Sequence, residues 1–374
     1  FLEAVRQFRQ DVGRDNAVFV HLALVPYIAT AHELKTKPMQ HSVRELRAIG
    51  IHPHILLCRT DRYLSPDIKA KLALYCDVPE EAVITALDVD SIYEVPLVLS
   101  GEGLDAIVLK SLGLESKGRD MGDWERLVGR IKNPRGEVVI GIVGKYVSFE
   151  DSYKSLNEAL THGGFGNDVR VVRRWVEAED LEYGNADAKL RGVDGILVPG
   201  GFGTRGTGGM VAAAEYARNV CGLATAHSTE VEPDAEHKVI YKLQDLLGVE
   251  DMGGTMRLGS YACQLVPGSR AAAIYGTTEI RERHRHRYEF NRHYEPCLTQ
   301  GGMAISGKTP DGKFVEIAEI PDHPWFVAVQ FHPEFQSKPL APHPLFADFV
   351  RASLENRKAR ALEGEASRVG VTLS

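Results

Sequence analysis

Short apolar runs alternate with amphipathic segments along most of the chain, and this alternation predicts an α/β fold with mainly parallel sheets. In the first part the apolar runs are nearly continuous, as expected for strands that are buried on both faces of a parallel sheet. Between them, apolar residues recur every three or four positions, which is the helical period. Strands are predicted at 17–26, 54–58 and 83–90, and helices at 1–12, 41–49 and 65–76.

The pattern changes between 117 and 137, where a polar, glycine-containing stretch carries one amphipathic helix at 124–131. Such a stretch is typical of a domain boundary, which we place near Pro134. The sequence therefore predicts two domains, 1–133 and 134–357, followed by a disordered tail at 358–374, where small and charged residues dominate. In the second domain, strands are predicted at 138–143, 169–176, 195–198, 264–266, 283–290, 314–319 and 326–330, and helices at 152–162, 210–217 and 345–357.

Composition narrows the class of protein. The 374 residues are 25% charged and 44% hydrophobic, which is ordinary for a globular protein, and the formal charge of −7 argues against a nucleic-acid partner. The longest apolar stretch, 17–31, is interrupted by His21 and Pro26, so no membrane span is predicted. Five widely spread cysteines without a C-x-x-C pair favour reduced thiols and a cytoplasmic location. The chain opens in helical register without a signal-peptide pattern, and we expect it to begin inside a domain.

Two predicted strands break into polar turns that could carry chemistry. The run 327–335, V-A-V-Q-F-H-P-E-F, places His332 and Glu334 just beyond a buried strand, and 196–205, I-L-V-P-G-G-F-G-T-R, ends in a glycine-rich turn. Open α/β sheets bind ligands at the carboxyl ends of their strands, and a histidine oriented by a carboxylate can act as a base. We expect the two stretches to be two walls of one pocket. A strand-end loop with a surface histidine is the alternative.

Two further segments are rich in cations. Residues 35–42, K-T-K-P-M-Q-H-S, lead towards a helix, and their ammonium groups and backbone N–H groups suit a polyphosphate, although a solvated loop explains the same letters. Residues 283–289, R-H-R-H-R-Y-E, would place arginines on one face of a strand and histidines on the other. The arginines need acidic partners or a carboxylate ligand. A metal at His284 and His286 would need a third ligand that the sequence does not suggest, so no metal site is predicted.

These segments occur together in the order found in CTP synthases. The resemblance rests on 35–42, 197–203, 253–259, 283–289 and 331–335, and it runs from Phe1 to about 352. It implies the last part of a P-loop-type amidoligase domain, followed by a flavodoxin-like class I glutamine amidotransferase domain. The implied enzyme is a ligase of pyrimidine biosynthesis that converts UTP, ATP and glutamine to CTP, ADP, phosphate and glutamate. The resemblance further implies Mg²⁺, GTP as an allosteric activator, CTP as an inhibitor, and a homotetramer.

The resemblance also assigns roles to individual residues. It implies His332 and Glu334 as catalytic residues, and it implies three groups of binding residues. These are Gly201, Glu230 and Arg287 for glutamine; Lys35, Thr36, Lys37, Pro38, Met39, Gln40 and Lys71 for UTP and CTP; and Leu87, Asp88 and Val89 for ATP.

The sequence departs from the family in two places. It contains no phosphate-binding glycine loop and none of the acidic Mg²⁺ ligands that belong to the front of the amidoligase domain. It also lacks the G-x-C-x-G turn that exposes the nucleophile, since Cys221 directly follows a predicted helix. We expect a gap between Arg218 and Cys221. If its residues are deleted, the sheet lacks a strand beside 195–198; if they are omitted, neighbouring Cα atoms near Arg218 should lie further apart than one peptide. The chain is then an incomplete, inactive CTP synthase or, alternatively, a non-catalytic nucleotide-binding or assembly protein.

Overall fold

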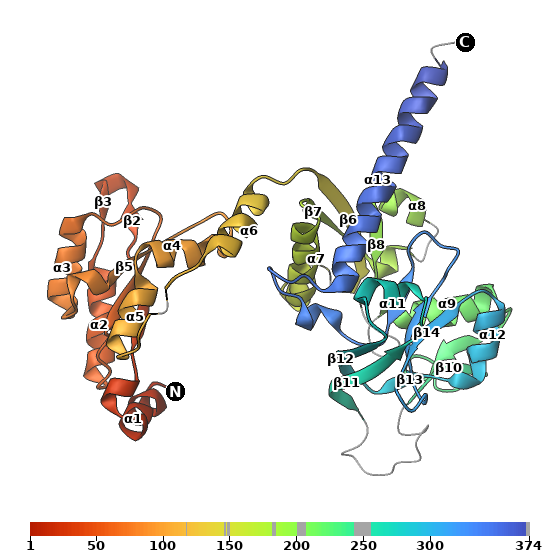
Figure 1. The fold of residues 1–374 in the computed structure, drawn as a ribbon, viewed down its shortest axis with the longest axis horizontal. Coiled ribbons are helices and arrows are strands. Elements are labelled where there is room, and N and C mark those ends of the chain that lie inside the picture. The colour runs from red at the N-terminus through yellow and green to blue at the C-terminus, as the bar shows by residue number, and fades with distance from the viewer. Residues whose placement is uncertain are drawn as a thin grey trace. The chain divides into compact units, whose positions relative to one another are not determined.

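The computed structural model describes residues 1–116, 118–145, 147, 150–181, 185–199, 207–242 and 256–371. The chain divides into two compact units, Phe1–Gly129 and Arg130–Ser374 (Figure 1). The division lies a few residues before Pro134, where the change in sequence pattern suggested a boundary. Each unit has hydrophobic clusters of its own, so each is described separately.

Unit 1 is built on a parallel sheet with the strand order β1-β4-β5. Its core contains Met39, Leu56 and Leu72, all fully buried. A short hairpin formed by β2 and β3 leads from the sheet into α2. The strands are β1 (Val20–Leu24), β2 (Tyr27–Ile28), β3 (Glu33–Leu34), β4 (Ile55–Thr60) and β5 (Val83–Leu87); the helices are α1 (Leu2–Val12), α2 (Lys37–Ala48), α3 (Pro66–Cys76), α4 (Val95–Gly101), α5 (Leu104–Ser111) and α6 (Gly122–Lys132).

The helix α2 begins four residues earlier than the sequence pattern predicted. Lys37–Gln40 form its first turn rather than a loop. Pro38 is tolerated there because the N–H groups of the first turn have no partner within the helix. Met39 is fully buried in the core of unit 1, and this packing draws the turn into the helix.

Unit 2 contains a parallel sheet, a mixed sheet and an antiparallel sheet. Their strand orders are β7-β6-β8, β13-β10-β9 and β12-β11-β14-β15-β16. The strands are β6 (Glu137–Gly144), β7 (Arg170–Glu177), β8 (Gly195–Leu197), β9 (Ala226–Ser228), β10 (His237–Lys242), β11 (Arg257–Leu265), β12 (Glu279–His286), β13 (Tyr288–Phe290), β14 (Ala304–Lys308), β15 (Val315–Glu319) and β16 (Val327–Val329). The helices are α7 (Lys154–Gly166), α8 (Ala186–Leu190), α9 (Thr207–Asn219), α11 (Arg270–Tyr275), α12 (Glu295–Gln300) and α13 (Pro344–Val371). The prediction of an α/β fold with parallel sheets is confirmed, and the antiparallel sheet is an addition to it.

The last helix, α13, is longer than the sequence pattern predicted. It continues to Val371, so the expectation of a disordered tail from Lys358 is wrong as far as this residue (Figure 1). The segment Arg357–Leu362, R-K-A-R-A-L, consists of residues with high helix propensity. The guanidinium of Arg360 also forms an ion pair with Asp194, which is almost fully buried at the start of β8. Propensity and this ion pair together extend the helix past the last turn that packs on the sheet.

The strand β8 is an edge strand among the described residues. It pairs with β6, and β6 pairs on its other side with β7. Ile196 in β8 is 48% exposed, although its sequence context is that of a buried strand. This is the arrangement expected if a neighbouring strand beside 195–198 is missing.

The predicted strand 283–290 is interrupted at Arg287. His284 and His286 are buried while Arg283 and Arg285 are exposed, so the predicted alternation is confirmed up to the end of β12. Arg287 then lies in a bend, and β13 belongs to a different sheet from β12. The chain therefore crosses between two sheets at this residue.

Candidate functional site

His332 and Glu334 lie just beyond the carboxyl end of β16. His332 Nδ1 is 2.9 Å from Glu334 Oε1, and both side chains are largely buried, with 23% and 17% of their surfaces exposed. A carboxylate at this nitrogen fixes the ring and leaves Nε2 for proton exchange. The strand-end position of both residues is as the sequence indicated, and their catalytic role stays a prediction. The other predicted wall, 200–203 with Gly201, lies outside the described residues.

The turn that carries Glu334 is anchored to β12. The backbone N–H of His332 donates to Arg283 O at 2.8 Å. On the far side of the turn, Gln336 Nε2 donates to Arg281 O at 3.0 Å and also to the carboxylate of Glu282. That carboxylate is buried and in turn binds Tyr275 and His343, each at 2.8 Å.

A buried polar network lies in the core next to this turn. Arg257 Nη2 donates to Glu316 Oε1 at 2.6 Å, and His284 Nε2 lies 2.6 Å from the other oxygen of the same carboxylate. Arg257 also reaches Glu289 through Nη1, at the longer distance of 3.3 Å. The positive charge of Arg257 therefore stabilises the Glu316 carboxylate more strongly than the Glu289 carboxylate.

Two groups of the network have strongly shifted pKa values. Burial, together with the nearby Glu316 carboxylate, raises the pKa of Glu289 to about 8 despite the Arg257 charge. Burial and the charge of Arg257 hold the pKa of His286 well below its usual range. At neutral pH, His286 is therefore neutral, and Glu289 holds its proton in a large share of molecules.

Glu230 and Arg287, both expected to bind glutamine, lie at the same edge of the sheet β13-β10-β9. Glu230 follows the carboxyl end of β9, where the N–H of Thr229 donates to Ile240 O at 3.0 Å. Arg287 precedes β13, whose first residue pairs with the last residue of the neighbouring β10. Arg287 is exposed and Glu230 is partly buried. An acid and a guanidinium at one edge suit the two charged groups of an amino acid.

Cys221 does not lie in a nucleophile turn. The chain runs from α9 directly through it, with the N–H of Leu223 donating to Ala217 O at 3.0 Å. Its thiol donates to Cys297 O at 3.3 Å and packs against the apolar cluster around α9 and α12. Burial, together with the Cys297 contact, raises the pKa of Cys221 to about 12. A thiol in this environment is a poor nucleophile.

The candidate nucleotide residues of unit 1 lie near the carboxyl edge of its parallel sheet. Lys35 N donates to Pro26 O at 2.9 Å, just beyond β1, and the Lys35 ammonium forms an ion pair with Glu33. Thr36 is the N-cap of α2, and Lys37–Gln40 form its first turn. Lys37 and Pro38 are exposed, whereas Met39 is fully buried and belongs to the core. Lys71 is exposed on α3, which packs against α2.

The expected ATP segment, Leu87–Val89, follows the carboxyl end of β5. Asp88 N donates to Thr60 O at 2.8 Å, and the Asp88 carboxylate accepts from Arg59 Nε at 2.8 Å. Arg59 is a residue that sequence reasoning missed at this edge. The available signal was its position at the polar end of an apolar strand.

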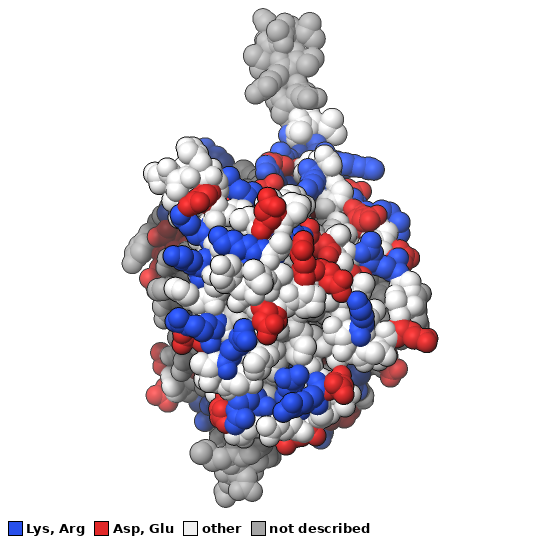
Figure 2. Space-filling view, turned by 90° about the vertical axis from the view of Figure 1, so that its left-hand side faces the viewer, with Lys and Arg blue, Asp and Glu red and all other residues white. Residues whose placement is uncertain are grey.

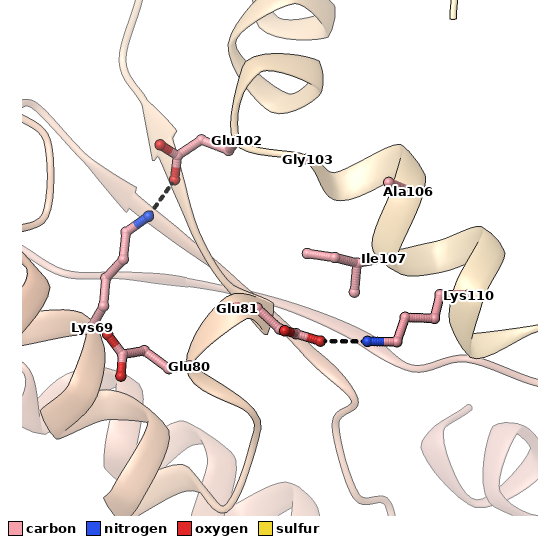
Figure 3. A pocket seen from close by; sticks show the side chains of 8 residues that line it. All are labelled: Lys69, Glu80, Glu81, Glu102, Gly103, Ala106, Ile107 and Lys110. Atoms are coloured by element: carbon pink, nitrogen blue, oxygen red, sulfur yellow. Dashed lines mark hydrogen bonds and ion pairs between the residues drawn. The ribbon is translucent and has the colours of Figure 1, made fainter. Parts of the chain in front are cut away.

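A cavity of about 610 Å³ in unit 1 is separate from these segments (Figure 3). Its two lysines are already neutralised, because Lys69 binds Glu102 at 2.7 Å and Lys110 binds Glu81 at 2.9 Å. The face drawn in Figure 2 likewise carries basic and acidic side chains side by side rather than a field of one sign. The two lysines of the cavity are therefore not available to a phosphate without breaking these ion pairs.

The described residues contain no group of three or more His, Cys, Asp or Glu side chains that could hold a metal ion. None of the helices in the described ranges is both long and apolar enough to cross a bilayer.

Comparison with known proteins agrees with this division of the chain. Residues 1–114 match the family "CTP synthase N-terminus", and residues 148–352 match "Glutamine amidotransferase class-I". A CTP synthase of Acidobacterium capsulatum is 58% identical over 380 residues, which cover 96% of this chain and 69% of the relative. A CTP synthase of Koribacter versatilis is 55% identical over 399 residues, covering 100% of this chain and 72% of the relative.

The chain also resembles a solved structure, the glutaminase domain of Trypanosoma brucei CTPS with bound acivicin. The TM-score is 0.54 at 36% identity, and the match covers 58% of this chain and 94% of that one. Family matches to both parts of the chain and relatives above 50% identity over nearly its whole length point the same way. The chain belongs to the CTP synthase family.

Proposed function

We propose that this chain is a glutamine-dependent CTP synthase that retains residues for binding glutamine but lacks the thiol nucleophile. The full reaction would convert UTP, ATP and glutamine to CTP, ADP, phosphate and glutamate. The observation that carries the proposal is the contact of 2.9 Å between His332 and Glu334 at the end of β16. Glu230 and Arg287 at one edge of the neighbouring sheet support it.

In this proposal, glutamine binds by its two charged ends. Arg287 would pair with the α-carboxylate, and Glu230 would accept from the α-ammonium group. The carboxamide then faces His332, whose Nε2 would move a proton between a nucleophile and the departing ammonia. Glu334 would hold the resulting imidazolium through Nδ1.

The nucleophile is the missing part. Cys221 has a raised pKa and is bonded to Cys297 O, so it is a poor candidate. The alignment with the K. versatilis enzyme runs over 399 residues although this chain has 374, so about 25 aligned positions have no counterpart here. This difference and the exposed Ile196 on β8 support a missing strand-turn-helix segment near Arg218.

In unit 1, we propose that UTP or its product CTP binds where Lys35–Gln40 lead into α2, with Lys71 as a further phosphate contact. A helix start beside lysines suits a triphosphate. Leu87–Val89 would contact ATP. The described residues offer no set of Mg²⁺ ligands, so no step is assigned to that ion. GTP activation and a homotetramer remain proposals from the family.

A non-catalytic nucleotide-binding or assembly protein is the second candidate function. The environment of Cys221 favours it, because a chain without a nucleophile cannot release ammonia from glutamine. The buried anchoring of the turn that carries His332 and Glu334 favours the first candidate. The first candidate function requires that the chain binds glutamine, and the second does not.

The experiment that tests the proposal measures ammonia release from glutamine between pH 6 and 9. We expect none above background in the parent chain, and Cys221→Ser should change nothing. Insertion of the segment that the K. versatilis enzyme has at this place should produce activity that His332→Ala abolishes. Ammonia release by the parent chain that Cys221→Ser removes would contradict the proposal.

A further inference from the structure

Gln330 is a fully buried amide that makes its contacts on both sides of Arg287. Its Nε2 donates to Tyr288 O at 2.9 Å and lies 3.0 Å from His286 Nδ1. His286 and Tyr288 are the two chain neighbours of Arg287. One carboxamide therefore contacts the ring of the residue before Arg287 and the backbone carbonyl of the residue after it.

The same residue is fixed to the strand that leads to His332. Gln330 N donates to Glu316 O at 2.9 Å, which continues the pairing of β15 with β16. His332 follows two residues later and is held in turn by Arg283 O. Gln330 thus connects the strand that ends at His332 to the bend that carries Arg287.

The bend needs such a connection because β12 and β13 belong to different sheets. The ladder of β12 ends where His286 pairs with Arg257, and that of β13 begins at Tyr288. Arg287 itself is exposed. Its backbone is positioned by its neighbours, and Gln330 forms contacts with the ring of His286 and with the carbonyl of Tyr288.

We propose that Gln330 is a positioning residue for the glutamine site. It sets the separation between Arg287 and His332 so that one ligand can place its α-carboxylate at the first and its carboxamide at the second. This inference rests on the proposed glutamine site. Gln330 itself would touch neither glutamine nor the reacting atoms.

The contacts of Gln330 also bear on which ring nitrogen of His286 carries the proton. With the Gln330 amide donating to both Tyr288 O and His286 Nδ1, we assign the ring proton to Nε2; Nδ1 also lies 3.5 Å from Glu289 Oε1. Among the residues that the structure describes, none forms a hydrogen bond with His286 Nε2. Without Gln330, the ring would gain by moving its proton to Nδ1, which lies 3.0 Å from Tyr288 O. The tautomer of His286 therefore reports on this connection without any ligand.

The test compares Gln330→Met, which keeps the volume but removes both donors, with Gln336→Met, which loosens the other side of the turn. Calorimetric titration measures the affinity for glutamine and for its α-carboxamide analogue, which lacks the negative charge. We expect the parent to bind glutamine at least tenfold more tightly than the analogue. Gln330→Met should bind glutamine at least tenfold more weakly and discriminate less than threefold, whereas Gln336→Met should keep the parent ratio. A folded Gln330→Met protein with the parent ratio would overturn the proposal.

A second measurement separates this proposal from the proposed glutamine site. If the parent binds no glutamine, the proposed site is wrong, and the connection is judged by ¹⁵N NMR of the His286 ring and by amide exchange at Arg287. We expect the Nε2–H tautomer in the parent, the Nδ1–H tautomer in Gln330→Met, and at least tenfold faster exchange of the Arg287 amide. An unchanged tautomer and an unchanged exchange rate would overturn the role of Gln330.

Discussion

At the scale of single residues, the core next to the His332 turn is governed by two buried carboxylates that share one arginine. Glu316 receives a hydrogen bond of 2.6 Å from Arg257, and Glu289 receives one of 3.3 Å. The second carboxylate is therefore undercompensated, and burial raises the pKa of Glu289 to about 8. A raised pKa in the folded state means that the folded protein binds the proton more tightly than the unfolded chain.

The raised pKa of Glu289 predicts how the free energy of unfolding changes with pH. The contribution of Glu289 is complete below its unfolded pKa of 4.5 and is lost as the pH rises towards about 8. Glu289→Gln removes the titration, so its free energy of unfolding should rise relative to the parent by up to about 1.4 kcal/mol per pH unit across that window. Urea unfolding of both proteins at pH 5.5, 7 and 8.5 measures the difference. A constant difference over this range would contradict the assignment.

Glu316→Gln serves as the matched comparison. It leaves Arg257 and His284 without their shared carboxylate, so we expect a loss of about 3–5 kcal/mol at every pH in the series.

The sequence predicted the residues that stand at strand ends and missed those that act through the core. His332 and Glu334 were recognisable because an apolar strand breaks at Pro333. The role of Gln330 was not recognisable, because its partner His286 is 44 positions away in the sequence, on the strand at the opposite end of the same sheet order. Only the fold brings those two residues together.

At the scale of elements, α13 closes the parallel sheet of unit 2 and packs against α7. Phe346, Phe349 and Val350 of α13 join Ile140 and Leu160 in one buried cluster. The helices approach closely at Gly163, where an added Cβ would lie 2.7 Å from Phe346 O. Backbone oxygens of a helix cannot move aside cheaply, so glycine is required here for packing rather than for a turn.

Replacement of that glycine tests the packing. Gly163→Ala should lower the free energy of unfolding by about 1–3 kcal/mol, as overpacking of a well-filled core does. Gly166→Ala in the same helix places its Cβ 3.5 Å from Pro342 Cγ, an ordinary contact, and should stay within about 1 kcal/mol of the parent. Equal stability of the two variants in denaturant unfolding would refute the close approach.

Element boundaries were predicted well where periodicity decides them and poorly where packing does. The helix α3 and the strands β6 and β7 lie within a residue or two of their expected positions. The start of α2 at Lys37 depends on the burial of Met39, and the break at Arg287 depends on a change of sheet. Neither the burial of Met39 nor the change of sheet at Arg287 can be predicted from the pattern of one sequence.

At the scale of the whole molecule, the two units have separate cores and separate candidate sites. Unit 1 carries the lysines proposed for a triphosphate, and unit 2 carries the proposed glutamine site. The division near Gly129 was visible in the sequence as a loss of apolar periodicity. The antiparallel sheet of unit 2 was not, because its strands were recognised singly and their partners were not specified.

Nucleotide binding by unit 1 is testable without catalysis. In calorimetric titration of CTP into the full chain, Lys35→Ala and Lys71→Ala should each weaken binding by about 1.5–3 kcal/mol, one to two decades in affinity. Lys110→Ala is the matched control, because its ammonium binds Glu81 at 2.9 Å in the separate cavity of Figure 3 and should not affect CTP. Parent affinity in both Lys35→Ala and Lys71→Ala would remove the site.

We propose that glutamine binds at a site around His332 and Arg287 and that Cys221 does not act as a nucleophile towards it. Titration of glutamine into the parent chain, with glutamate analysed in the same samples, tests it most directly. We predict saturable binding that Arg287→Ala weakens by at least tenfold, that Arg285→Ala on the exposed face of β12 leaves unchanged, and that yields no glutamate. Absence of binding, equal binding by the Arg287→Ala protein, or glutamate formation in the parent would contradict the account.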